Sequence, residues 1–135
     1  MTVYVLDSSA LIRYIDNEAG SSRVVEILKA CVAGHAEIRI SAVQWGEVAG
    51  NIRKRAGATE ERRILSGLPT EIGIVPVAGS DAVRAAGLKV DRKIAYADAF
   101  AVGVALAFPD HVLVTADFGF KPVVDLATIE FLPAK

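Results

Sequence analysis

Cysteine is nearly absent from the chain, and no apolar stretch reaches membrane-spanning length. Cys31 is the only cysteine among 135 residues, so no disulfide can form within the chain. The longest apolar run, AFAVGVALAF at 99–108, stops before Pro109. Because a membrane-spanning helix needs about 20 apolar residues, we expect a buried helix here and no membrane association. The first residues do not join a basic segment to an apolar one, so we expect no signal peptide and a cytoplasmic protein.

Neither sign of charge is in excess. The chain carries 15 Lys and Arg against 16 Asp and Glu, so no overall basic field indicates binding to nucleic acid. Apolar residues make up 53% of the chain and the mean hydropathy is +0.40. These values predict a tightly packed core and a surface for self-association or a partner. The length suits one domain covering residues 1–135.

Short β-rich segments alternate with segments of helical periodicity. The expected strands are VYVL (3–6), IRIS (38–41), IGIVPV (72–77), HVLVTAD (111–117) and ATIEFL (127–132). The expected helices are one capped by Ser8 or Ser9, then 23–33, 42–57, a short segment capped by Thr59, one capped by Ser80, and 96–108. This alternation is typical of an α/β fold in which helices cover both faces of a parallel sheet.

Four acidic residues fall where such a fold gathers ligands. Asp7 and Asp117 follow two expected strands, and the carboxyl ends of parallel strands meet at one edge of the sheet. Glu47 lies on the helix after the 38–41 strand and can reach back toward that edge. Asp98 lies in the first turn of the most apolar helix, close to the core. We therefore expect the four carboxylates to converge.

Each acid also has a purely structural alternative. Asp7 can cap the first helix, and Asp98 can be a first-turn charge favoured by the helix dipole. Asp117 can open a turn in ADFGF, and Glu47 can be a solvated helix residue. The combination of four acids at one sheet edge, rather than any single one, indicates a site.

The composition of this site favours a hard divalent cation. Grouped carboxylates repel one another unless a cation neutralises them, and oxygen ligands suit Mg²⁺ or Mn²⁺. His35 and His111 lack ligand spacing and Cys31 has no cysteine partner, so the pattern does not indicate zinc. A metal held by carboxylates activates water and stabilises a phosphoryl transition state, which is nuclease chemistry.

Hydroxyl groups accompany two of the acids. Ser8 follows Asp7, and Thr115 lies two residues before Asp117. These hydroxyls either orient a carboxylate or a metal-bound water, or form local caps, and the sequence leaves both alternatives open.

Four segments together resemble a known family. DSSALIRYI after an apolar strand, SAVQWGEV, YADAFAVGVAL and LVTADFGF match, in order and spacing, the PIN-domain ribonucleases. The resemblance covers nearly the whole chain and is closest to the small VapC-type toxins of bacterial toxin–antitoxin pairs.

The resemblance implies a Rossmann-like sheet of about five parallel strands and a Mg²⁺- or Mn²⁺-dependent endoribonuclease. The family's acids match Asp7, Glu47, Asp98 and Asp117, and its two hydroxyl residues match Ser8 and Thr115. The family also implies a homodimer and an antitoxin that covers the site. Because FGF follows Asp117, the further acid of some members is absent, and one or two bound ions remain alternatives.

Local basic clusters supply the positive charge that phosphate binding needs. Lys89, Arg92 and Lys93 precede Asp98, and Arg13 lies on the first helix; we expect these four to bind RNA. A second cluster either binds RNA or is a solvated helix end, and comprises Arg53, Lys54, Arg55, Arg62 and Arg63.

Aromatic residues that can stack on unpaired bases are few. We expect Trp45 and Tyr96 in the core or at a dimer contact. Phe118 and Phe120 either pack under the turn after Asp117 or line the groove, and the sequence does not distinguish these arrangements.

The sequence therefore predicts a metal-dependent endoribonuclease toxin in which Asp7, Asp98 and Asp117 are ligands. Glu47 is either a ligand or positions the attacking water. A phosphatase or phospho-receiver domain fits poorly, because serines follow Asp7 and Lys121 lies in a turn before Pro122. The remaining alternative is a catalytically silent module that binds RNA or an antitoxin.

Overall fold

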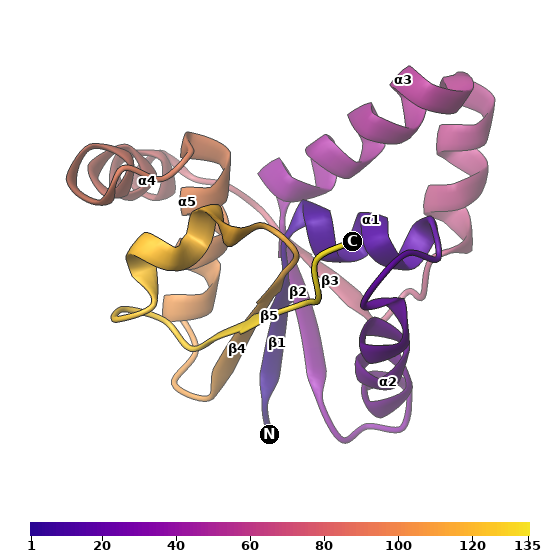
Figure 1. The fold of residues 1–135 in the computed structure, drawn as a ribbon, viewed down its shortest axis with the longest axis horizontal. Coiled ribbons are helices and arrows are strands. Elements are labelled where there is room, and N and C mark those ends of the chain that lie inside the picture. The colour runs from indigo at the N-terminus through magenta and orange to yellow at the C-terminus, as the bar shows by residue number, and fades with distance from the viewer.

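A computed structural model describes residues 1–135 and contains one five-stranded, wholly parallel sheet (Figure 1). The strands are β1 (Val3–Leu6), β2 (Glu37–Ser41), β3 (Ile72–Val75), β4 (His111–Thr115) and β5 (Ile129–Phe131). Their order is β3-β2-β1-β4-β5, so the chain winds outward in both directions from β1. The expected α/β architecture is confirmed. In such sheets the ligand crevice opens at the carboxyl ends of the two strands where the winding reverses, here β1 and β4.

Helices cover both faces of the sheet. One face carries α1 (Ser8–Ile15), α2 (Ser21–Val32) and α3 (Ala42–Gly67), and the other carries α4 (Gly79–Arg92) and α5 (Tyr96–Leu106). In Figure 1 the carboxyl ends of the strands point toward the start of α3 and the start of α5. No helix is both long and apolar enough to cross a membrane.

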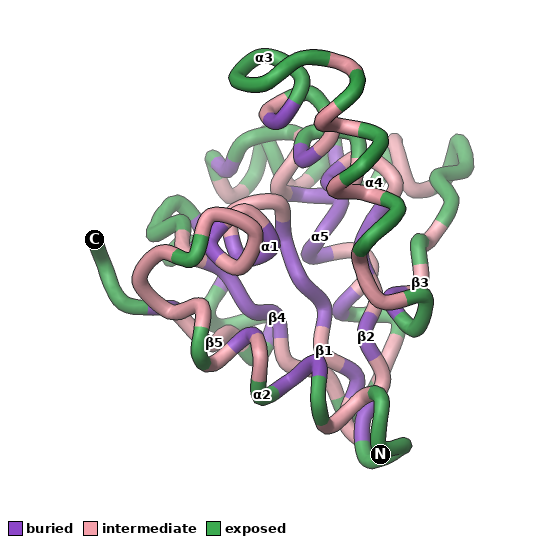
Figure 2. The backbone as a smooth tube through the Cα atoms, turned by 90° about the vertical axis from the view of Figure 1, so that its right-hand side faces the viewer, coloured by how far each residue is buried: buried purple, intermediate pink, exposed green.

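The core consists of two apolar clusters, one on each side of the sheet. Leu6 and Val114 belong to the cluster under α1, α2 and α3, and Val5 and Leu113 belong to the cluster under α4 and α5. Figure 2 shows buried positions concentrated on β1, β2, β4 and α5. Burial on both faces explains why these strands are nearly continuous apolar runs rather than alternating ones.

Two predicted helix caps are wrong. Helix α1 is capped by Asp7, whose side chain accepts a hydrogen bond from the Ala10 backbone N–H, rather than by Ser8 or Ser9. Helix α4 starts one residue before Ser80, and Ala78 is its N-cap residue. The Asp81 carboxylate accepts the Ala78 backbone N–H at 2.7 Å, which satisfies the backbone donor of the N-cap residue.

The two helical segments predicted at 42–57 and after Thr59 are joined into α3. The helix bends at Gly57, whose φ of 88° lies in the left-handed region that glycine adopts without strain. An ion pair between Arg53 and Glu61 links the two halves across the bend, with an N–O distance of 3.6 Å. The second half returns toward α1 and α2 (Figure 1).

Gly20 is a position outside the site at which both the backbone conformation and the packing exclude a side chain. It is the N-cap of α2 with φ of 89°, and a Cβ added there would lie 2.9 Å from Cβ of Leu132. Leu132 follows β5 and is 1% exposed, so it has little room to move. The packing of α2 against the C-terminal segment therefore requires glycine at this position.

We expect Gly20→Ala to lower the free energy of unfolding by about 2 kcal/mol, because the methyl group adds both a clash and a strained backbone. Gly87→Ala is the control, since Gly87 lies inside α4 with open space around its Cα. That change should raise the free energy of unfolding by roughly 0.5–1 kcal/mol through helix propensity. Urea unfolding of both variants checks the pair, and equal stability of the Gly20 variant and the wild type would contradict the packing argument.

Candidate functional site

Asp7 is a buried carboxylate held by several hydrogen bonds at the junction of β1 and α1. It is 1% exposed. Its Oδ1 accepts the Ala10 N–H at 2.9 Å, and its Oδ2 accepts the Thr115 hydroxyl at 2.6 Å. The Ser9 hydroxyl lies 2.8 and 2.9 Å from the two oxygens. Burial raises the pKa of Asp7 to about 6, although these hydrogen bonds act in the opposite direction.

Thr115 connects Asp7 to Asp117. Its hydroxyl, fully buried at the end of β4, donates to Asp7 and accepts the Asp117 backbone N–H at 2.9 Å. The Asp117 carboxylate accepts the Gly119 N–H at 2.8 Å and begins the 3₁₀ helix η1 (Phe118–Val123). Asp117 thus opens a turn, which confirms the structural alternative given for it. It is also exposed and lies beside the buried Asp7.

The two serines after Asp7 have different partners. The Ser8 hydroxyl donates to Oε1 of Glu47 at 3.2 Å and does not contact Asp7. Ser9, which sequence reasoning did not single out as a site residue, bonds Asp7 and accepts the Ala116 backbone N–H at 2.8 Å. The available signal was its position: a hydroxyl in the first helical turn, two residues after an N-cap acid, can reach back to that acid.

Gln44 is a second residue that sequence reasoning missed. It is 0% exposed, and an amide buried this completely requires hydrogen-bond partners for both its oxygen and its nitrogen. Its Oε1 accepts the Ser8 backbone N–H at 2.6 Å, and its Nε2 donates to the Ala97 carbonyl at 2.7 Å. Gln44 therefore joins α1, α3 and α5 at the residues next to Asp7 and Asp98. A polar residue one turn before Glu47, on the face directed at the sheet, was the available signal.

The pKa of Asp98 reflects the proximity of the other three acids. It is half-buried in the first turn of α5. Burial raises its pKa to about 6, and repulsion from Asp117, Asp7 and Glu47 contributes to that rise, while a hydrogen bond from Gln44 acts to lower the pKa. Asp7, Glu47 and Asp117 therefore all act on the charge of Asp98, and the assignment of the four acids to one site stays a prediction.

The donor set fits a hard divalent cation in its chemistry. No three His, Cys, Asp or Glu side chains lie close enough in this structure to share one ion. All four candidate donors are carboxylates, and a cation would offset the like-charge repulsion at Asp98. Glu47 and Asp117 are exposed, and exposed side chains change rotamer readily. These two are the donors that can move toward an ion while Asp7 stays fixed.

The basic residues expected to bind RNA have different environments. Arg13 is 9% exposed, and its Nη1 donates to the carbonyls of Ala19 and Pro133 at 2.7 and 2.8 Å. The structure contradicts an RNA-binding role for Arg13, because its guanidinium anchors the C-terminal segment instead. Arg92 is paired with Asp125 at 2.7 Å. Lys89 and Lys93 are exposed and free of ion pairs.

The second basic cluster is largely engaged within the protein. Arg55 pairs with Asp16 and Arg63 pairs with Glu60, at N–O distances of 3.1 and 2.6 Å. With the pair across the α3 bend, these contacts favour the interpretation of a solvated helix end for most of this cluster.

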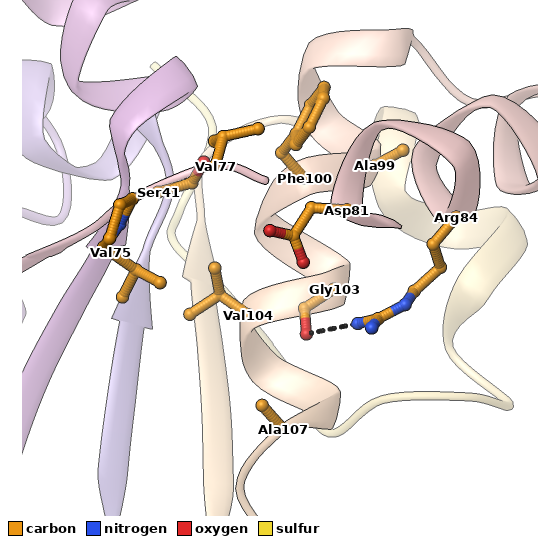
Figure 3. Close-up of a pocket in the computed structure, with 11 residues that line it drawn as sticks. Ser41, Val75, Val77, Asp81, Arg84, Ala99, Phe100, Gly103, Val104 and Ala107 are labelled. Atoms are coloured by element: carbon orange, nitrogen blue, oxygen red, sulfur yellow. Dashed lines mark hydrogen bonds between the residues drawn. The ribbon is translucent and has the colours of Figure 1, made fainter. Parts of the chain in front are cut away.

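A cavity of about 120 Å³ lies beside the acidic cluster, between the ends of β2 and β3 and the helices α4 and α5 (Figure 3). Asp81 and Arg84 of α4 face it, and Nη1 of Arg84 donates to the Gly103 carbonyl at 3.3 Å. None of the four acids lines this cavity. It is a separate feature, and the acids lie at the open edge of the sheet.

Comparison with known proteins places the chain in a family. The PIN domain family model matches residues 4–126. Among curated proteins, none matches this chain.

Solved structures share the fold at low sequence identity. VapBC2 from Rickettsia felis, bound to a DNA fragment from its promoter, aligns with a TM-score of 0.74 and 18% identity over 97% of this chain and 99% of that chain. DNA-bound VapBC from Salmonella typhimurium gives 0.73 and 17% over 97% and 98%. VapC20 from Mycobacterium tuberculosis, described as a Sarcin-Ricin loop cleaving toxin, gives 0.66 and 16% over 96% and 99%.

The raised pKa values of Asp7 and Asp98 predict an unusual pH dependence of stability in metal-free protein. Both groups bind protons more tightly folded than unfolded, so their contribution to stability is full below about pH 4 and is lost as the pH rises through about 6. Between pH 4.5 and 7, Asp7 alone should remove about 2 kcal/mol of stability. Urea unfolding in EDTA across this range measures the slope.

Asp98→Asn should show a shallower loss of stability than the wild type over the same range, because one of the two titrating carboxyls is gone. Asp91→Asn, at an exposed position of α4, should match the wild type. Stability that is constant or rises with pH in metal-free wild type would contradict the buried-acid interpretation.

Gln44→Leu should lower the free energy of unfolding by about 2–4 kcal/mol, because it leaves the Ser8 N–H and the Ala97 carbonyl buried without partners. Thr2→Val is the matched control, since it removes only the exposed hydrogen bonds from Thr2 to Asp110 and should cost under about 0.5 kcal/mol. Thermal or urea unfolding measures the free energy of unfolding of both variants. Equal small losses would mean that the hydrogen bonds of Gln44 between the three helices do not stabilise the fold.

Proposed function

Because the chain belongs to the PIN-domain family, we propose that it is a metal-dependent endoribonuclease that acts as the toxin of a toxin–antitoxin pair. The observation that carries the proposal is the electrostatic coupling of Asp7, Glu47, Asp98 and Asp117 at the strand ends where the winding of the sheet reverses. That location is where open α/β sheets bind ligands. The exposure of Glu47 and Asp117 makes the site accessible to a substrate as large as RNA.

We propose that Asp7, Asp98, Asp117 and Glu47 hold Mg²⁺ or Mn²⁺, with one ion as the minimum. When bound, such an ion activates water and offsets charge on the scissile phosphate. Asp7 is the fixed member, because Thr115 and Ser9 hold both of its oxygens. Glu47 is an exposed member that Ser8 orients, which suits it to hold the ion or to position the attacking water.

The protein's own groups also limit how the site rearranges. Gln44 ties the start of α1 to the first turn of α5, so the segments that carry Asp7 and Asp98 keep their spacing while exposed carboxylates turn. Two acids on linked segments and two exposed acids held by single hydrogen bonds give the preorganisation that metal-assisted hydrolysis uses.

Lys89 and Lys93 are proposed to contact the phosphates of the substrate, because both are exposed, unpaired and just before α5. Arg92 takes part only if its pair with Asp125 opens, and an exposed pair of this kind opens at small cost.

The proposal extends to partners and cell compartment. A similar structure from Klebsiella pneumoniae is described as a toxin–antitoxin complex, and those from Rickettsia felis and Salmonella typhimurium are described as VapBC bound to DNA. We propose that this chain, a single PIN domain over residues 1–135, likewise has a cognate antitoxin, forms a homodimer and acts in the cytoplasm.

The first test is cleavage of a mixed pool of single-stranded and structured RNA with Mg²⁺, with Mn²⁺ and with EDTA. Wild-type protein should cleave only with metal, and Asp98→Asn should lose at least about 100-fold in rate, because removing a metal-holding charge weakens transition-state stabilisation. Sequencing of the RNA ends identifies the cleavage sites. Asp91→Asn is the control and should cleave at the wild-type rate.

Cleavage that persists in EDTA, or that Asp98→Asn performs at the wild-type rate, would refute the assignment. Folded, metal-loaded wild type that binds RNA or an antitoxin without cleaving any RNA would establish the remaining alternative, a catalytically silent binding module.

A further inference from the structure

Two aromatic side chains lie exposed, and both adjoin acids of the site. The chain has five phenylalanines, three tyrosines and one tryptophan. Among these aromatics, exposure is confined to Tyr96, at 41%, and Phe118, at 44%. Tyr96 precedes Asp98 by two residues in the first turn of α5, and Phe118 directly follows Asp117. Of the two alternatives for Tyr96, the core is therefore wrong and a dimer contact stays a prediction, and Phe118 is not buried as Phe120 is.

Each exposed ring packs against a second aromatic ring. Tyr96 meets Phe100 edge to face, with ring centroids 4.9 Å apart and an interplanar angle of 80°. Phe118 stacks on Phe131 at 5.4 Å and 22°. Aromatic pairs of this geometry are favourable beyond the area they bury, so the rings are held in place while part of each remains in water. Such an arrangement presents a rigid apolar platform to solvent.

An exposed lysine accompanies each platform. Nζ of Lys121 lies over the Phe118 ring, 5.2 Å from its centroid, in a cation–π contact that a stacking base would displace toward its own phosphate. Lys93 ends α4, three residues before Tyr96, with a left-handed backbone at φ of 58° that turns the chain toward α5. Neither lysine is engaged in an ion pair. A lysine and an exposed aromatic ring are thus close in sequence to Asp98, and a second such pair is close in sequence to Asp117.

We propose that Tyr96 and Phe118 are two nucleobase-stacking sites that hold unpaired bases of an RNA on either side of the phosphate at the acidic cluster. Lys93 and Lys121 contact the neighbouring phosphates. The inference rests on the proposed function and specifies the form of its substrate, a single-stranded segment or loop whose bases can leave their own stack.

The charge of the site explains why such contacts are needed. Four carboxylates repel the phosphate backbone, and one divalent ion offsets only part of their charge. Further affinity for RNA must therefore come from groups that this repulsion does not weaken or from cations outside the cluster. Stacking on an aromatic ring is largely independent of charge and contributes about 1–3 kcal/mol per base. In a double helix the base faces are covered by neighbouring bases, so the two platforms select unpaired RNA.

Fluorescence anisotropy with a labelled single-stranded RNA tests the inference. All variants are made in the Asp98→Asn protein so that cleavage does not interfere, and binding is measured at one fixed salt concentration. Tyr96→Ala and Phe118→Ala should each weaken binding by about 5- to 150-fold, the range to which the stacking energies correspond. Phe118→Trp and Tyr96→Phe should retain binding, because each keeps a planar ring.

Three controls make the result specific. Val83→Ala removes a valine that is 74% exposed on α4, and should leave RNA affinity unchanged. A fully paired RNA duplex should bind alike to all variants. Circular dichroism and thermal unfolding establish that the alanine variants are folded, and the ring-retaining variants keep the test valid if an alanine variant is not.

Alanine variants that bind single-stranded RNA as tightly as their parent would overturn the inference. So would a loss that the duplex shows equally, or a loss of antitoxin affinity with RNA affinity unchanged. If wild type cleaves RNA while the alanine variants bind normally, the stacking inference alone fails. If folded wild type neither binds nor cleaves any RNA with metal, the proposed function itself is refuted, and the stacking inference is refuted with it.

Discussion

The hydrogen bond from Thr115 to Asp7, 2.6 Å long and buried between the ends of β1 and β4, is the contact on which the site depends. It crosses the point where the sheet's winding reverses, so one carboxylate is fixed to both central strands. The same carboxylate caps α1, and the same hydroxyl receives the Asp117 N–H. The positions of the first helix and of the turn after β4 are thereby set relative to each other by one buried pair.

Keeping that carboxylate buried is unfavourable when it is charged, as its pKa of about 6 indicates. Asp98 adds to this cost, because the other three acids repel it. A protein selected only for stability gains nothing from this arrangement, and strained or destabilised groups of this kind concentrate at functional sites. The proposed cation relieves the repulsion, so stability and function are linked through the same charges. Gln44, buried beside these acids with both ends of its amide bonded, keeps the elements in place while the charge remains uncompensated.

Within a few residues of Asp98 and Asp117 along the chain, several exposed side chains are aromatic or basic rather than acidic. Tyr96 and Phe118 offer braced apolar platforms, and Lys93 and Lys121 offer cations. A polyanion approaching the metal-free site meets repulsion at its centre and attraction at its margins. Under the proposed function, RNA binding and catalysis belong to different side chains. Membership of the PIN domain family, shown over residues 4–126, does not by itself determine this division.

The sequence by itself determined the α/β class and the parallel sheet, because apolar strands are local patterns whose outcome parallel topology constrains. It also predicted, from the strand-end carboxylates, that four acids converge. Tertiary structure decided the rest. Ser9 rather than Ser8 bonds Asp7, since only the direction of the first helical turn distinguishes two adjacent hydroxyls. Arg13 anchors the C-terminal segment through Pro133, a contact across 120 residues that no local pattern encodes. Exposure of Phe118 likewise depends on where Phe131 of β5 lies, which only the completed sheet fixes.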